Sequence, residues 1–126
     1  MRLSLSVIWF VFLASCISCS GWKREADRAA EKYYTYLIEE RYEDFVAGIA
    51  CADSFPEFYR SQMVDVIRNY VYRERELHGG LMSVEAVDCK VKGNVANAFL
   101  ELLFADSVKE EISVPMVYCD DEWKMQ

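Results

Sequence analysis

Residues 80–119 read GLMSVEAVDCKVKGNVANAFLELLFADSVKEEISVPMVYC, and this stretch decides the fold. Apolar and polar side chains alternate along three segments within it, namely 81–91, 95–105 and 108–118. Alternation is typical of strands with one buried face, and turn-forming pairs such as Gly93-Asn94 join neighbouring strands into hairpins. We therefore predict an antiparallel β-meander, with a last short strand at residues 123–126.

The first turn sets the expected pairing of the meander. If Lys92 pairs with Val95, one face gathers Val87, Cys89, Val91, Ala96, Ala98 and Leu100, which is a coherent core face. The opposite face would carry Met82, Val84, Ala86, Val95, Phe99 and Leu103. A sheet face this apolar is predicted to be a homodimer interface or partner surface, or to be covered in part by a helix.

The chain before Gly80 has the three- and four-residue apolar spacing of helices. One helix is predicted from Trp22 to Ile38, and a second from Tyr42 to Ala50. A third should open at the capping-box sequence of residues 54–57 and end at His78, followed by glycines suited to a left-handed cap. This order of helices before strands predicts a single α+β domain over residues 22–126.

The N-terminus has the form of an export signal. Arg2 precedes an uncharged run from Leu3 to Cys19. The run ends in Leu13-Ala14-Ser15-Cys16, which resembles the lipobox of bacterial lipoproteins. We predict a signal peptide over residues 1–15, a lipidated Cys16 and a short tether over residues 16–21. The alternatives are cleavage after Ser20 and a retained membrane anchor.

Composition narrows the class of partner. The chain has 126 residues, 53% of them hydrophobic, and a formal net charge of −7. A chain with this apolar content folds, and its negative charge makes nucleic acid an unsuitable partner. Because Ile17 rather than an acidic residue follows Cys16, we predict the outer membrane, facing the periplasm, as the location in the cell envelope.

Three helices followed by a curved meander resemble the cone-shaped α+β fold named after nuclear transport factor two. The hairpin Val91–Ala96, the terminal step Glu122–Met125, the tyrosine-containing first helix and the lipobox are similar to those of lumazine-binding-like lipoproteins of gram-negative gut bacteria. The resemblance implies this fold for residues 22–126. It brings no catalytic residues with it.

Aromatic residues supply the candidate binding site. Tyr33, Tyr36, Tyr70 and Tyr118 are the residues predicted to line a pocket inside the cone for a flat apolar ligand. The alternative is that they are core residues. An isomerase- or dehydratase-like enzyme of this fold would need an inward carboxylate beside a tyrosine, and Glu85 is the nearest candidate by strand parity.

The cysteines and the single histidine suggest no redox or metal chemistry. If the domain has a disulfide, Cys51 would pair with Cys89 or Cys119, and the alternative is a buried thiol. His78 is predicted to complete the last turn of its helix, and no cofactor or metal is expected. The sequence therefore favours a membrane-anchored, non-catalytic module that binds a small ligand or a protein. An enzyme and a structural accessory subunit are the alternatives.

Overall fold

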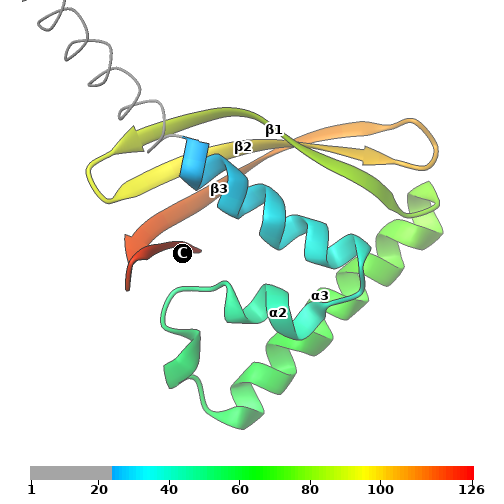
Figure 1. Cartoon of the computed structure of the whole chain (residues 1–126). Coiled ribbons are helices and arrows are strands. Elements are labelled where there is room, and N and C mark those ends of the chain that lie inside the picture. Colours follow the sequence, from blue (N-terminus) through cyan, green and yellow to red (C-terminus); the bar gives the residue numbers. More distant parts are fainter. Residues whose placement is uncertain (1–23) are drawn as a thin grey trace, which may run out of the picture.

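The computed structural model describes residues 24–126, in which helices come first and a sheet follows (Figure 1). The chain is helical over residues 24–38. The later helices are α2 (Tyr42–Ala47), η1 (Ala52–Ser54) and α3 (Glu57–His78), and the strands are β1 (Leu81–Lys92), β2 (Val95–Phe104), β3 (Lys109–Cys119) and β4 (Glu122–Met125). The predicted α+β class is confirmed. The predicted signal peptide, lipidation site and tether lie outside the described residues.

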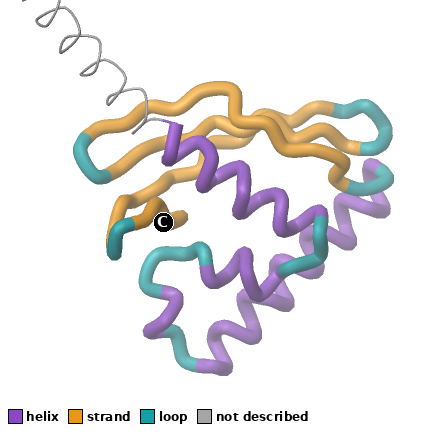
Figure 2. The backbone as a smooth tube through the Cα atoms, viewed as in Figure 1, coloured by secondary structure: helices purple, strands orange, loops and turns teal. Residues whose placement is uncertain are grey.

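The four strands form one antiparallel sheet in the order β1-β2-β3-β4. The first helix lies along one face of this sheet, and α2 and α3 lie on the same side (Figure 2). Its apolar stripe is buried as the spacing predicts, through Ala26, Ala30, Tyr33 and Leu37. The core therefore lies between this helix and the inner sheet face, to which β2 contributes Ala96, Ala98 and Leu100.

The first hairpin has the predicted register at its turn, with Lys92 opposite Val95 and Cys89 opposite Ala98. The register then shifts between Ala86 and Asp88, where β1 has one extra residue. Val87, predicted on the core face, is 46% exposed at this shift. The prediction for Val87 was wrong because the extra residue of a bulge interrupts the alternation of side chains between the two sheet faces, while the apolar-polar pattern of the sequence continues through it.

The same bulge reverses the predicted faces of Val84 and Ala86, whereas Met82 is exposed as predicted. Ala86 lies opposite Leu100 and Val84 opposite Leu102, both of which are buried inner-face residues. Ala86 and Val84 accordingly pack against the core and not on the outer face, which corrects the prediction.

The outer sheet face is consequently more polar than predicted. Along β2 it alternates apolar and polar side chains, namely Val95, Asn97, Phe99, Glu101 and Leu103. The Lys90 ammonium lies 5.7 Å from the centroid of the Phe99 ring. Mixed polarity of this kind is compatible with water, so the apolar area available for a partner is smaller than the sequence pattern indicated.

Two predicted helix boundaries were wrong. The second helix ends at Ala47 and not at Ala50, because the following backbone pairs with β4: Ala50 N–H donates to Met125 O at 2.7 Å. The capping box does not form, since the Ser54 hydroxyl donates to Cys51 O at 2.7 Å. Pro56 occupies the N-cap position of α3 instead.

The end of α3 agrees with the prediction. Gly79 has φ of 81° and donates its N–H to Arg75 O at 3.0 Å, as a left-handed helix cap requires. His78 lies in the last turn, where its Nδ1 is 2.7 Å from the Asp106 carboxylate. The end of the helix is thereby connected to the turn between β2 and β3. No helix within residues 24–126 is both long and apolar enough to cross a membrane.

Candidate functional site

Tyr33 is the central aromatic residue of the candidate site. Its side chain is 4% exposed, and its hydroxyl donates a hydrogen bond to Trp123 O at 2.7 Å. Burial raises the pKa of Tyr33 above the usual range of a phenol, and Lys124 partly opposes this shift. The hydroxyl is therefore a protonated donor that is already engaged in holding the first helix to β4.

Tyr118 and Trp123 complete an aromatic floor beside Tyr33. They are directly paired across β3 and β4, and their ring centroids are 5.4 Å apart in an edge-on arrangement. Asp120 and Asp121 have positive φ values of 52° and 64°, which suits the tight turn that joins these strands. The short link thus brings the two rings together.

An open groove of about 390 Å³ lies between the first helix and the β3–β4 hairpin. We call it the hairpin groove, and its lining consists of Glu25, Arg28, Ala29, Lys32, Tyr33, Tyr118, Asp121, Glu122 and Trp123. Tyr118 is the partly exposed ring of the aromatic floor, whereas Tyr33 and Trp123 are almost fully buried. Arg28 and Lys32 supply cations from the helix, and the carboxylates come chiefly from the hairpin.

Lys124 ties the hairpin beside this groove to the end of α2. Its Nζ lies 2.9 Å from the Glu122 carboxylate and donates to Ala47 O at 3.2 Å. Partial burial lowers the pKa of Lys124, but the hydrogen bond to Glu122 and the nearby Tyr33 more than compensate, so the net shift is upward. Glu122 is therefore partly neutralised by its own hairpin.

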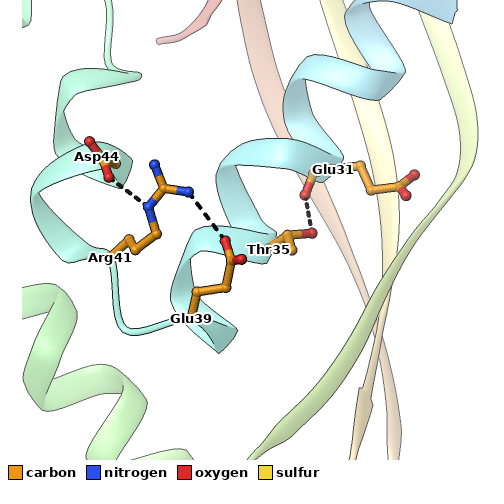
Figure 3. A network of polar contacts seen from close by, with 5 residues as sticks. All are labelled: Glu31, Thr35, Glu39, Arg41 and Asp44. Atoms are coloured by element: carbon orange, nitrogen blue, oxygen red, sulfur yellow. Dashed lines mark hydrogen bonds and ion pairs between the residues drawn. The ribbon is translucent and has the colours of Figure 1, made fainter.

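Tyr36 lies further along the first helix, where its ring centroid is 6.4 Å from that of Tyr33. The Arg41 guanidinium is 4.3 Å from the Tyr36 ring centroid. Arg41 is itself oriented by Asp44 at 2.8 Å and Glu39 at 3.6 Å (Figure 3). This network holds the Arg41 cation over the Tyr36 ring.

A second shallow groove of about 420 Å³ runs past Tyr36 and Arg41. It shares Arg28 and Lys32 with the hairpin groove. The two grooves therefore border the same pair of cations, and the structure brings Tyr33, Tyr36 and Tyr118 into one neighbourhood.

Tyr70 does not belong to this neighbourhood. It lies on α3, where burial raises its pKa to about 12 and where Glu74, Glu110 and Tyr34 are its nearest electrostatic neighbours. It packs against the core but lines neither of the two grooves. The predicted set of four tyrosines is therefore divided between two places in the cone.

Sequence reasoning missed Arg28, Lys32 and Trp123 as groove residues. A signal for the two cations was present, since a four-residue spacing places them on the same side of a helix. Trp123 belongs to the terminal step that carried the family resemblance, but its position beside Tyr33 depends on tertiary packing.

Glu85 does not fulfil the enzymatic expectation. It is exposed and lies opposite Glu101, a residue of the outer sheet face. The bulge in β1 therefore directs Glu85 away from the cone interior. Within residues 24–126, no group of three or more His, Cys, Asp or Glu side chains is arranged to hold a metal ion.

The cysteines of residues 24–126 are not joined to one another by a disulfide. Cys51 is exposed before η1, whereas Cys89 is fully buried on the inner face of β1. The structure thus places the two residues suggested for a disulfide in very different environments.

Comparison with known proteins identifies a structural neighbour of this chain. No protein-family model matches the sequence, and no curated protein matches it. A solved structure from Campylobacter jejuni, described as an NTF2-like transpeptidase, superposes with a TM-score of 0.63 at 12% identity. The match covers 76% of this chain and 92% of that chain. Together with the element order and the sheet, this similarity shows that the chain has the nuclear-transport-factor-two-like fold.

Proposed function

We propose that this protein is a lipid-anchored envelope protein whose domain binds a ligand in the hairpin groove without catalysing a reaction. The observation that carries the proposal is the aromatic floor of Tyr33, Tyr118 and Trp123 beside the cations Arg28 and Lys32. Such a surface suits a flat apolar molecule with a polar or anionic edge, either a small ligand or a protein side chain.

The polar groups of the groove support binding more than proton transfer. The Tyr33 hydroxyl is engaged by Trp123 O, and Glu122 is engaged by Lys124. A general acid or base needs a titratable group within reach of the substrate and with a suitable pKa. The pKa of Tyr33 is shifted upward, away from neutral pH. Ligand positioning is therefore the better use of this site.

The anchor would hold the groove close to a membrane. Glu25, at the groove rim, follows Cys16 by nine residues. Nine residues reach at most about 30 Å when fully extended. A lipidated Cys16 would accordingly keep the site near the bilayer surface, in our proposal the periplasmic side of the outer membrane.

The anchor is tested by replacing its acceptor in the full chain. Cys16→Ala should abolish lipid attachment and move the protein from the membrane fraction to the soluble fraction, because one lipidated cysteine supplies the anchor. Cys19→Ala is the matched control and should leave the protein in the membrane fraction. Membrane attachment and processing that persist unchanged in Cys16→Ala would exclude the lipoprotein assignment.

The groove is tested with 1-anilinonaphthalene-8-sulfonate, a flat aromatic anion whose fluorescence rises in apolar surroundings. The full chain in detergent should bind this probe, and Tyr118→Ala should weaken binding about tenfold, because one face of the aromatic floor is lost. Tyr72→Ala is the control, since Tyr72 is 49% exposed on α3 and outside the groove. Equal binding by both variants and the parent would contradict the proposed site.

The two alternatives make different predictions for the same protein. An enzyme that used another part of the cone as its active site would not respond to Tyr118→Ala. A structural accessory subunit would bind neither the probe nor a small molecule retained on purification. Native mass spectrometry of the detergent-extracted chain distinguishes the last case, because a retained ligand adds its mass.

A further inference from the structure

Helix α3 has two apolar stripes, and only one of them is covered by the described domain. The covered stripe faces the core through Val64 and Val71. The second stripe lies on an adjacent side of the helix, and we call it the outer stripe of α3. It consists of Tyr59, Met63, Val66, Tyr70 and Leu77.

The residues of the outer stripe lie on one side of α3 and are largely exposed there. An α-helix has 3.6 residues per turn, so residues about seven or eleven positions apart lie on the same side. Tyr59, Val66 and Leu77 are spaced by seven and eleven residues, so they point in nearly the same direction. They are 46%, 63% and 64% exposed. Met63 and Tyr70 are half-buried on the core side of the stripe. A helix that faces only water normally has polar residues on its exposed side, so an exposed apolar row of this length indicates a binding surface.

Four of the five positions of the stripe are symmetric about residue 68, and the fifth, Met63, has Arg73 as its mirror position. Tyr59 lies as far before this point as Leu77 lies after it, and Val66 and Tyr70 are related in the same way. Two such helices packed antiparallel therefore place Tyr59 against Leu77 and Val66 against Tyr70 across a twofold axis. A surface complementary to itself is the requirement for a symmetric dimer.

Charge favours the same antiparallel arrangement. The first half of α3, residues 57–67, has a net charge of −1, and the second half, residues 68–78, has +1 with His78 neutral. Antiparallel packing brings halves of opposite sign together, whereas parallel packing brings like halves together.

We propose that the outer stripe of α3 binds the outer stripe of a second copy of this chain in an antiparallel, twofold-symmetric dimer. This inference does not depend on the hairpin groove, which lies on other elements. The proposed dimer also does not use the outer sheet face. Apolar and polar residues alternate on that face along β2, so it is the less apolar of the two surfaces.

The arrangement is tested by cysteine cross-linking of the full chain in membranes, with Cys19, Cys51 and Cys119 replaced by Ser. Asn69→Cys should give a covalent dimer with a short bis-maleimide, because the two copies of residue 69 lie within about 3 Å of each other along the axis. Tyr59→Cys should not give a covalent dimer, since the two copies of residue 59 lie about 27 Å apart along the axis. Combining Tyr59→Cys with Leu77→Cys in one chain should restore the cross-link.

A second pair of variants locates the interface. Val66→Glu, added to Asn69→Cys, should reduce the cross-linked fraction at least tenfold, because it places two carboxylates in the centre of the stripe. Val95→Glu on the outer sheet face is the matched control and should leave the fraction unchanged. The circular dichroism spectrum of each variant shows whether the fold is retained.

The inference is overturned by any of three results. One is cross-linking by Tyr59→Cys alone, which indicates parallel packing. Another is loss of the cross-link in Val95→Glu but not in Val66→Glu, which indicates the sheet face. The last is no cross-link at Asn69→Cys or at the Tyr59→Cys, Leu77→Cys pair, which shows that the stripe does not pair with a second copy.

Discussion

At the scale of single residues, the contact between Gly48 and Tyr33 has the clearest consequences. A Cβ atom at Gly48 would lie 2.6 Å from ring carbons of Tyr33, closer than atoms can approach. The ring has little freedom to move away, because its hydroxyl is held by Trp123 O. Gly48 has a φ of −77°, which other residues also adopt, so packing and not backbone conformation requires a glycine here.

Gly48→Ala should therefore lower the free energy of unfolding by about 1–3 kcal/mol, which is typical of an overpacked core. Chemical denaturation followed by circular dichroism measures this change. In a Tyr33→Ala background the ring is absent, so the cost of Gly48→Ala should nearly disappear. A cost that is equal in both backgrounds would show that the ring is not its cause.

The cysteines show how the environment of a residue depends on distant packing. Cys51 and Cys89 have the same side chain, yet one is exposed and the other is fully buried. Alternation in the residues around Cys89 predicted its place on the core face, but no pattern around Cys51 indicated that it is exposed. The difference follows from the sheet register and from the position of the first helix above β1.

At the scale of elements, the end of α3 is linked to the β2–β3 turn by several polar contacts. The Asp106 carboxylate is 2.7 Å from His78 Nδ1, and Asp106 N–H donates to His78 O at 3.1 Å. The hydrogen bond to Asp106 raises the pKa of His78, and the reciprocal bond lowers that of Asp106. This contact is consequently strongest while His78 is protonated and Asp106 is ionised.

Stability should therefore depend on pH through His78. Because its pKa is higher in the folded than in the unfolded state, its contribution is complete below the unfolded value near 6.5. The contribution is lost as pH rises through the folded value. The pKa of Asp106 is lowered, so its contribution disappears as pH falls through that folded value. The contact is predicted to be most stabilising between these two limits.

The expected result for His78→Gln is a loss of unfolding free energy that is larger at pH 5.5 than at pH 8.5. Urea denaturation at the two pH values measures it. Arg68→Gln is the control, because it removes an exposed ion pair with Asp65 that contains no histidine. Parallel pH dependence of His78→Gln and the parent protein would show that the contact with Asp106 does not contribute.

Much of the element scale follows from local sequence. Turn residues and alternation located the three long strands, and the spacing of Tyr33 and Leu37 located the buried side of the first helix. The errors have two physical causes. The end of α2 and the bulge near Val87 are set by backbone pairing with strands distant in sequence. The capping box is lost locally, because the Ser54 hydroxyl donates to Cys51 O.

At the scale of the whole molecule, the proposed functional surfaces occupy separate regions. The hairpin groove lies between the first helix and β3–β4, whereas the outer stripe belongs to α3. The proposed anchor precedes the first helix. In this arrangement a dimer through α3 would leave both hairpin grooves free to bind ligand, and each copy would carry its own anchor.

The amino-acid sequence by itself determined the element order, the α+β class and the buried helix stripe, because turn chemistry and hydrophobic periodicity are local properties. Only the tertiary structure decided which aromatic residues meet. It brought Tyr33 to Trp123, 90 positions later, and separated Tyr70 from them. Assembly of the groove depends on the register of β3 with β4 and on where the first helix crosses the sheet. Those quantities are set by packing between segments distant in sequence, and no local pattern encodes them.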